Sequence, residues 1–269
     1  MAKKYLLTVL PCFVLCLSSV LLDVANASNN DVLKKAKLER VVIKSDLLKK
    51  KMNALVYLPK GYGDGRQYPV LYFIHGFGKD ERLLTEIGFD QKATVLIEAD
   101  RIDPLIIVAS QMDNSWDLNS ATEYKYEVHD SEMFYYGMYE DYFLKEVIPY
   151  IDSKYNTING RNGRYIGGSS MGGYIALYYG LRHSELFAKI GGHMPSVRLG
   201  SRFSWFVYPT QESSMERDLT VLADSKDISN LSVYLDCGES DSLLSSVNNF
   251  YLKLLVKGAK ARFDSSEGP

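Results

Sequence analysis

The segment from Gly167 to Gly173, "GGSSMGG", constrains the fold of this chain more than any other stretch. A short strand-like pattern ending in Tyr165-Ile166 precedes it, and the helical pattern "GGYIALYYGL" follows it. A chain that passes directly from a strand into a helix must turn sharply, and glycines flanking the turn remove side chains that would collide there. The segment therefore predicts a strand–turn–helix unit that holds a serine out as a nucleophile, with a plain glycine turn as the alternative.

Two adjacent serines compete for that position, and the register of the glycines separates them. The GxSxG pattern fits Gly168 to Gly172 with Ser170 at its centre, whereas centring it on Ser169 would put Met171 where glycine is required. Ser170 is therefore the predicted nucleophile. The helix that follows it would begin at Met171, and the partial positive charge of a helix N-terminus favours a developing anion.

A tetrahedral intermediate of acyl transfer needs two hydrogen-bond donors for its oxyanion. The backbone N–H of Met171, next after the nucleophile, is expected to be one of them. The segment His75-Gly76-Phe77-Gly78 closes the first buried strand, and we expect the backbone N–H of Phe77 to be the second donor. His75 itself is expected to orient this loop rather than to act as a base.

Strand and helix patterns alternate along the rest of the chain. We expect strands at 38–44, 52–58, 68–75, 105–110, 164–167, 187–190, 232–235 and 259–264, and helices at 81–99, 141–155, 171–181 and 247–257. The apolar runs at 68–75 and 105–110 are nearly continuous, as in strands buried on both faces. Such alternation predicts an α/β fold with a mostly parallel central sheet and helices on both faces.

Two features interrupt this alternation. Pro149 falls inside the helix expected at 141–155, where it would kink or restart the helix. Residues 114–140 are rich in tyrosine and acidic residues and are expected to form an inserted loop or lid above the sheet. A lid of this composition could contact a sugar or an aryl group, and it could equally be a rigid aromatic surface patch.

The N-terminus has the order of a secretory signal. Two lysines are followed by an apolar stretch, residues 5–22, and then by Ala25-Asn26-Ala27. We expect residues 1–27 to be a signal peptide cleaved before Ser28, and the protein to be periplasmic or secreted. Pro11 and two serines interrupt the stretch, which argues against a membrane anchor.

Composition excludes several other functional classes. The 269 residues are 46% hydrophobic and 24% charged, as in an ordinary globular domain. The net charge of −2 becomes −3 when the signal is removed with its two lysines and one aspartate, so nothing suggests nucleic-acid or membrane binding. Cys12 and Cys16 would leave with the signal, and Cys237 alone cannot form an internal disulfide. No cluster has zinc-site spacing and no phosphate-loop motif occurs, so we expect neither a metal nor a cofactor.

Four segments together resemble the putative-esterase family of α/β-hydrolases. They are "YPVLYFIHGFG", "YEDYFLKEVIPYIDSKY", "YIGGSSMGGYIALYYGLRHSELF" and "LDCGESDSLL". The family includes feruloyl and acetyl-xylan esterases, S-formylglutathione hydrolases and mycolyltransferases. The resemblance covers most of residues 50–269 and implies an α/β-hydrolase domain at 28–269. It also implies a catalytic triad of Ser, Asp and His in that chain order, which the fold itself favours.

The resemblance selects Asp241 as the acid of the triad. It lies in a turn after the strand pattern "SVYLD", together with Asp236 and Glu239. Gly238 makes a tight turn at this place physically reasonable. The alternative is that Asp241 caps the helix that begins near Ser242, since aspartate is a favoured N-cap residue.

The base of the triad is missing from the place where the resemblance implies it. The four histidines, His75, His129, His183 and His193, all precede Asp241. In the family the base follows the acid, usually as a Gly-His pair after a late strand. We therefore expect the final strand and helix to be cut short, as in a fragment or a prematurely terminated copy, and the chain to be nearly inactive. A substitute histidine is the alternative, and His193 is the best candidate.

Three hypotheses about function follow. The first is an exported serine carboxylesterase that acts on a small or carbohydrate-linked acyl ester through an acyl-enzyme, impaired by its missing histidine. The second is a non-catalytic carbohydrate-binding or degenerate esterase-like protein. The third, acyl transfer to a sugar, uses the same residues but a different acceptor. S-formylglutathione hydrolases work in the cytosol, so the signal argues against that member of the family.

Overall fold

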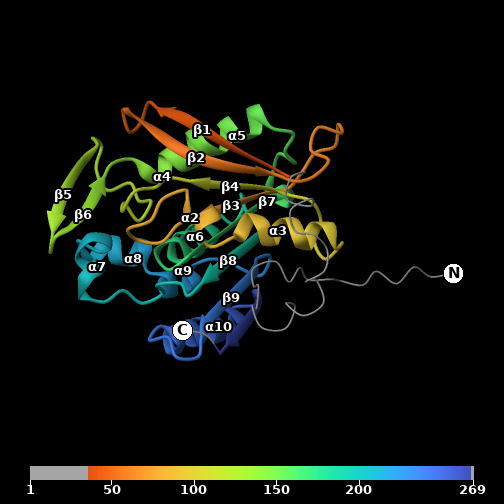
Figure 1. Ribbon diagram of the computed structural model, residues 1–269. Helices are drawn as coiled ribbons and strands as arrows, with labels where there is room; N and C mark the ends of the chain where they lie inside the picture. The colour runs from red at the N-terminus through yellow and green to blue at the C-terminus, as the bar shows by residue number, and fades with distance from the viewer. Residues whose placement is uncertain (1–35, 268–269) are drawn as a thin grey trace.

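Eight strands form one central sheet in the order β1-β2-β4-β3-β7-β8-β9-β10 (Figure 1). The computed structural model describes residues 36–267, so the predicted signal peptide lies outside the described residues. The pairs β1–β2 and β2–β4 are antiparallel, and the other pairs, from β4–β3 through β9–β10, are parallel. The predicted α/β fold with a mostly parallel sheet is confirmed.

The strands lie where the sequence predicted them, with small shifts at their ends. They are β1 Lys37–Ser45, β2 Lys50–Leu58, β3 Val70–Ile74, β4 Ile106–Ser110, β7 Arg164–Ser169, β8 Lys189–His193, β9 Ser232–Gly238 and β10 Lys260–Ser266. The helices are α2 Leu83–Glu86, α3 Phe89–Glu98, α4 Tyr139–Tyr142, α5 Ile148–Lys154, α6 Met171–Arg182, α7 Ser201–Val207, α8 Gln211–Arg217, α9 Leu219–Ser225 and α10 Leu244–Val256. A π-helical turn, η1 Phe143–Val147, joins α4 to α5, and a 3₁₀ turn, η2 Arg161–Gly163, precedes β7.

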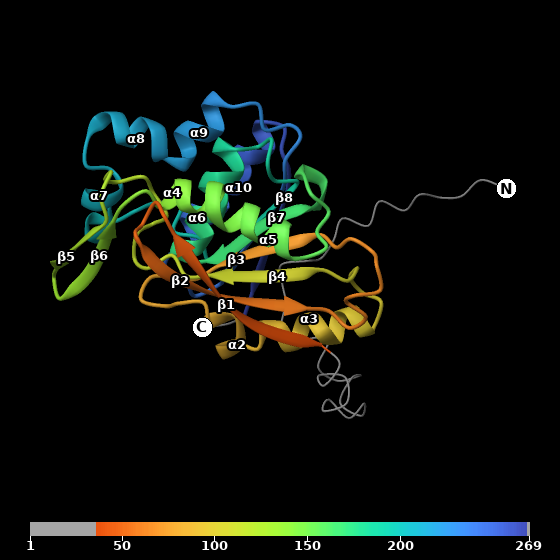
Figure 2. The same ribbon diagram turned by 90° about the horizontal axis from the view of Figure 1, so that it is seen from above.

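Helices cover both faces of the sheet, and the alternation of side chains along β3 shows why. Leu71 and Phe73 belong to a core with residues of α2 and α3, whereas Tyr72 and Ile74 belong to a core with residues of α5 and α6. Figure 2 shows α2 and α3 on one side of the sheet and α5 and α6 on the other. All five residues of β3 are buried, as expected for a central strand of a parallel sheet.

Two predicted helices are divided at identifiable residues. The helix expected at 81–99 is split into α2 and α3 at Gly88, whose φ of 65° belongs to the left-handed region that glycine adopts readily. The helix expected at 141–155 passes through the π-helical turn just before Pro149, which lies in the first turn of α5. A local change in hydrogen bonding is a usual way for a helix to accommodate a residue that has no N–H.

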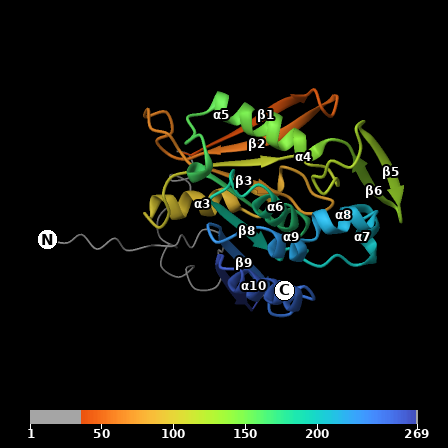
Figure 3. The same ribbon diagram turned by 180° about the vertical axis from the view of Figure 1, so that it is seen from behind.

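The predicted insertion at 114–140 contains a hairpin that lies outside the main sheet. Its strands are β5 Lys125–His129 and β6 Glu132–Tyr136, which pair with each other in a separate two-stranded sheet. Figures 1 and 3 show the hairpin projecting at one end of the molecule beside α7. Phe134 of β6 packs against Trp205 of α7, which anchors one face of the hairpin on that helix.

No helix within residues 36–267 has the length and apolar character needed to span a membrane.

Candidate active site

Ser170 occupies the sharp turn between β7 and α6. Its φ of 55° and ψ of −112° lie in a region that residues with a side chain rarely adopt. Ser169 is the last residue of β7 and has regular strand pairing, opposite His193 of β8. The strained conformation therefore belongs to Ser170, the serine that the glycine register selects.

The two glycines of the GxSxG pattern are required by close approach to β3. A Cβ added to Gly168 would lie 2.5 Å from the carbonyl oxygen of Ile74. A Cβ added to Gly172 would lie 2.1 Å from the same oxygen and 2.6 Å from the carbonyl oxygen of His75. The expected reason for the glycine spacing, the removal of colliding side chains, is therefore observed.

The two predicted oxyanion donors lie on the segments that meet at this turn. Met171 is the first residue of α6, a helix of 12 residues, so its N–H is at the positive end of the helix dipole. Phe77 follows Gly76, and a Cβ on Gly76 would lie 3.4 Å from the carbonyl oxygen of Ser169 and 3.7 Å from Cβ of Ser170. The loop that carries Phe77 therefore passes directly beside the serine.

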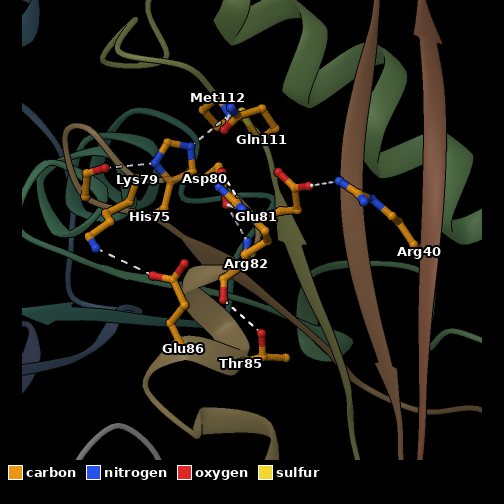
Figure 4. A network of polar contacts seen from close by, with 11 residues as sticks. Arg40, His75, Lys79, Asp80, Glu81, Arg82, Thr85, Glu86, Gln111 and Met112 are labelled. Atoms are coloured by element: carbon orange, nitrogen blue, oxygen red, sulfur yellow. Dashed lines mark hydrogen bonds and ion pairs between the residues drawn. The ribbon is translucent and has the colours of Figure 1, made fainter.

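His75 holds this loop in place through contacts at both nitrogens of its ring. The ring is buried; Nδ1 lies 2.9 Å from the carbonyl oxygen of Gly76, and Nε2 lies 3.0 Å from the backbone nitrogen of Met112 (Figure 4). Because Met112 N–H can only donate, Nε2 must accept, and the imidazole is neutral with its proton on Nδ1. Burial also lowers the pKa of His75. With both nitrogens engaged, His75 orients the loop, as expected.

A second segment contacts Ser170 from the other side. We call residues 193–196, His193-Met194-Pro195-Ser196, the exit loop, because they begin at the last residue of β8 and lead out of the sheet. The N–H of Ser170 donates to the carbonyl oxygen of His193 at 2.9 Å, and the N–H of Ser196 donates to the carbonyl oxygen of Ser170 at 3.1 Å. The hydroxyl oxygens of Ser170 and Ser196 are 3.4 Å apart. Sequence reasoning missed Ser196, because no local pattern marks a residue whose role depends on a neighbouring strand.

The side chain of His193 is paired with a carboxylate. Its Nδ1 hydrogen-bonds to Asp236, which lies opposite His193 in the β8–β9 register. Asp236 is 5% exposed, whereas half of the His193 side chain is exposed. The hydrogen bond to Asp236 raises the pKa of His193. Asp236 is one of the three carboxylates considered for the acid, and it is the one that contacts an imidazole.

Asp241 lies in the turn after β9, and its carboxylate is engaged locally. One carboxylate oxygen accepts the N–H of Leu243 at 2.8 Å, and the N–H of Asp241 donates to the carbonyl oxygen of Gly238 at 3.1 Å. Helix α10 begins at Leu244, so Asp241 orders the turn before the helix and is not its N-cap residue. No hydrogen bond between described residues joins Asp241 to Ser170 or to a histidine.

The hydroxyl of Ser170 has no imidazole partner within residues 36–267. His129 and His183 contact other parts of the molecule. His129 lies against Trp205 of α7, and His183 hydrogen-bonds to Glu140 of α4. His193 contacts Ser170 through its backbone carbonyl only. The described residues therefore bring the predicted nucleophile and the predicted oxyanion donors together without a histidine side chain in contact with Ser170.

Aromatic side chains surround the loop that carries Phe77. The Phe77 ring lies 5.3 Å from that of Phe134 on β6 and 4.9 Å from that of Phe203 on α7. Phe203 also lies 5.1 Å from Trp116. The predicted insertion thus contributes two of these rings, Trp116 and Phe134, and α7 supplies another that the sequence reasoning did not identify.

No group of three or more His, Cys, Asp or Glu side chains within residues 36–267 is arranged to hold a metal ion.

Comparisons with known proteins agree on one family. A family model described as "Putative esterase" matches residues 45–264. The chain is 30% identical over 166 residues to the esterase Rv1288 of Mycobacterium tuberculosis, covering 61% of this chain and 33% of that protein. It is 32% identical over 164 residues to an endo-1,4-beta-xylanase/feruloyl esterase of Xylanibacter ruminicola, covering 57% of this chain and 21% of that protein.

The solved structures include a ferulic acid esterase with a TM-score of 0.72 and 26% identity. The match covers 87% of this chain and 90% of that one. The chain spans only a third or less of the curated relatives named above.

Proposed function

The chain belongs to the Putative esterase family of α/β-hydrolase fold, and from this premise we propose that it is a serine carboxylesterase with Ser170 as its nucleophile. One observation carries the proposal. Of the two adjacent serines, Ser170 adopts the strained conformation between β7 and α6, and Gly168 and Gly172 pack closely against β3. Backbone strain of this kind persists only where the surrounding structure enforces it, and it is concentrated at functional sites.

The proposed reaction proceeds through an acyl-enzyme. The Ser170 hydroxyl attacks the ester carbonyl and loses its proton to water, because no imidazole within residues 36–267 contacts it, and the N–H groups of Phe77 and Met171 stabilise the oxyanion. The carbon–oxygen bond to the alcohol then breaks and the alcohol leaves with a proton from water. Water attacks the acyl-enzyme in the same way and releases the acid. Asp241, in the turn after β9, is proposed as the acid of a triad whose histidine the described residues do not supply.

We propose that the chain of 269 residues performs this reaction slowly. A serine hydroxyl is a poor nucleophile without an adjacent base, and no imidazole within the described residues hydrogen-bonds to Ser170. Oxyanion stabilisation and binding alone leave a residual acceleration of roughly 10³–10⁴-fold over water in a serine hydrolase that lacks its triad residues.

The proposed substrate is an ester with an aromatic or carbohydrate-linked acyl group. Phe134 and Trp116 are fully buried, so of the rings around Phe77 an aryl acyl group could contact only the partly buried Phe77 and Phe203, with which it could pair at centroid separations of about 4.5–7 Å. A relative named as a feruloyl esterase and a ferulic acid esterase of known structure support this substrate class.

The decisive experiment compares Ser170→Ala with Ser169→Ala. The two serines are adjacent, so the second variant is a matched control for the same chemical change at the same turn. After incubation with an aryl acetate or methyl ferulate, intact-protein mass spectrometry should find an acyl adduct on the unaltered chain and on Ser169→Ala but none on Ser170→Ala, whereas slow turnover by oxyanion stabilisation and binding alone can persist in Ser170→Ala. An acyl adduct that still forms at this turn in Ser170→Ala would disprove the assignment.

A second candidate function is a non-catalytic, carbohydrate-binding protein of the same fold. The absence of an imidazole contact to Ser170 within residues 36–267 favours it, as does the exposed Tyr126 on the hairpin, which is 61% exposed. Binding to xylan that is unchanged by Ser170→Ala, without turnover of any ester, would support this candidate.

We also propose that the protein acts outside the cytoplasm, on the basis of the signal-like order of residues 1–27. Mass determination of the protein from the culture medium or periplasm should give an N-terminus at Ser28.

A further inference from the structure

The backbone of Ser170 is held from outside its own strand and helix. Its N–H donates to the carbonyl oxygen of His193, and its carbonyl oxygen accepts the N–H of Ser196. Its hydroxyl lies 3.4 Å from that of Ser196. The N–H of Tyr174 in α6 also donates to the carbonyl oxygen of Ser170, at 3.0 Å, as part of the first helical turn. The other three contacts come from the exit loop, so the position of that loop contributes to the orientation of Ser170.

The exit loop is itself strained and must be held in turn. Met194 has a φ of 44°, in the left-handed region that an unbranched residue with a side chain adopts only at a cost. Pro195 packs closely against the first turn of α6, since a Cβ on Gly173 would lie 2.9 Å from its Cα. Such a loop keeps its conformation only if other contacts fix it.

One residue of β9 provides two of those contacts. The carbonyl oxygen of Asp236 accepts the N–H of Met194 at 2.9 Å, and its carboxylate hydrogen-bonds to Nδ1 of His193. Asp236 lies opposite His193 in the sheet, and Asp264 of β10 lies opposite Asp236 on the other side. A continuous series of contacts therefore runs from Asp236 through the exit loop to Ser170.

We propose that His193 and Asp236 are positioning residues that hold the exit loop, and through it Ser170, in the reactive orientation. The proposal rests on the proposed role of Ser170 as nucleophile. It gives His193 a role different from that of a base, because its side chain is turned to Asp236 and only its backbone carbonyl contacts Ser170. The charged groups that face the imidazole are Asp236 and, in the turn after β9, Asp241, both of which raise the pKa of His193.

The test uses two substitutions at one position. His193→Ala removes the donor to Asp236. His193→Asn keeps an N–H donor close to the place of Nδ1, because the asparagine amide nitrogen superimposes approximately on it, but it can neither act as a base nor carry a charge. Asp227→Asn is the control, because the Asp227 carboxylate accepts hydrogen bonds from Ser229 in the turn before β9 and none of its hydrogen bonds between described residues reaches Asp236 or the exit loop.

Reactivity of Ser170 is measured in the full chain as the second-order rate of labelling by an alkyl fluorophosphonate. In that reaction the serine oxygen bonds to phosphorus, fluoride leaves, and the hydroxyl proton passes to solvent. Values of kcat and KM for an aryl acetate are measured beside it, and circular dichroism confirms that each variant is folded.

We expect His193→Ala to lower the labelling rate and kcat about tenfold with KM changed less than about twofold, since a misplaced nucleophile costs rate rather than binding. His193→Asn should lose less than about threefold, and Asp227→Asn should match the unaltered chain. A His193→Asn variant as slow as His193→Ala would overturn the proposal by showing that the ring itself takes the proton. A His193→Ala variant with full reactivity would overturn it as well.

Failure of the proposed function is distinguishable from these outcomes. If the fluorophosphonate labels the Ser170→Ala variant at the same residue that it labels in the unaltered chain, that residue is the nucleophile and Ser170 is not. If Ser170→Ala is unlabelled while His193→Ala reacts normally, Ser170 is the nucleophile and only the positioning role is wrong.

Discussion

At the scale of single residues, the active-site turn depends on the absence of side chains as much as on Ser170. Gly172 lies so close to β3 that a methyl group would have to displace the backbone of Ile74. Ser170 keeps its positive φ because Gly168 and Gly172 pack against the backbone of β3 and fix the chain on both sides of it.

Gly172→Ala is therefore expected to destabilise the protein by about 3 kcal/mol or more and to abolish ester hydrolysis, since overpacking against backbone has no cheap relaxation. Gly200→Ala is the control, because nothing lies within 4 Å of a Cβ built there and its φ of −74° is ordinary. Urea unfolding of both variants measures the difference. Equal stability of the two would show that the turn is more adaptable than these distances indicate.

At the scale of elements, the loop of residues 75–78, which carries the proposed oxyanion donor Phe77, is connected to the β5–β6 hairpin through Asn114. The side-chain oxygen of Asn114 accepts the N–H of Gly78 at 2.7 Å, and its nitrogen donates to the carbonyl oxygen of Met133 at 2.9 Å. One side chain thus connects the loop of the proposed oxyanion donor to β6.

Asn114→Ala should lower kcat about tenfold with little change in KM, because a displaced donor weakens transition-state stabilisation, where complete loss of a donor costs roughly 10²–10³. Asn119→Ala is the matched control. The Asn119 side chain makes two hydrogen bonds as well, both with Asp141, at 3.1 and 3.2 Å. Neither of them involves residues 75–78. Steady-state kinetics on an aryl acetate would contradict the expectation if both variants lost the same activity.

At the scale of the whole molecule, the sheet brings together residues that are distant in sequence. Ser169, His193 and Asp236 are successive partners across β7, β8 and β9. Several carboxyl groups are buried in the fold, and Asp117 is the most deeply buried of those described: it is completely buried, and burial raises its pKa well above its ordinary value.

The stability of the fold should therefore respond to Asp117→Asn in a pH-dependent way. Because the folded-state pKa is raised, the folded protein binds more protons than the unfolded chain above a pH of about 3.9, and ionisation opposes folding there. The variant should be more stable at pH 7 by about 1–3 kcal/mol, and the gain should vanish as the pH falls below the unfolded pKa.

Thermal unfolding across this pH range measures the effect, with the exposed Asp103→Asn as control. A variant that is less stable at pH 7 would indicate that the Asp117 carboxylate has a stabilising partner.

The local patterns of the sequence predicted the strands of the central sheet, the strand–turn–helix unit and the choice of Ser170 over Ser169, but not the β5–β6 hairpin, which was expected to be a loop. These features depend on residues close together in the chain: apolar runs define β3 and β4, and two glycines define the turn. The interruptions of two helices were harder to predict. The π-helical turn before Pro149 and the division of a helix at Gly88 reflect packing as well as local preference.

The α/β architecture, the strand–turn–helix unit around Ser170 and the need for glycine beside it could therefore be predicted from the sequence, since period, length and turn chemistry are local properties. Which side chains meet around Ser170 depends on the tertiary structure. Ser196 reaches Ser170, Asp236 pairs with His193, and Asn114 holds Gly78, because strand order and register place them together. Such contacts join residues 26 to 43 positions apart, and no pattern within either segment specifies its partner.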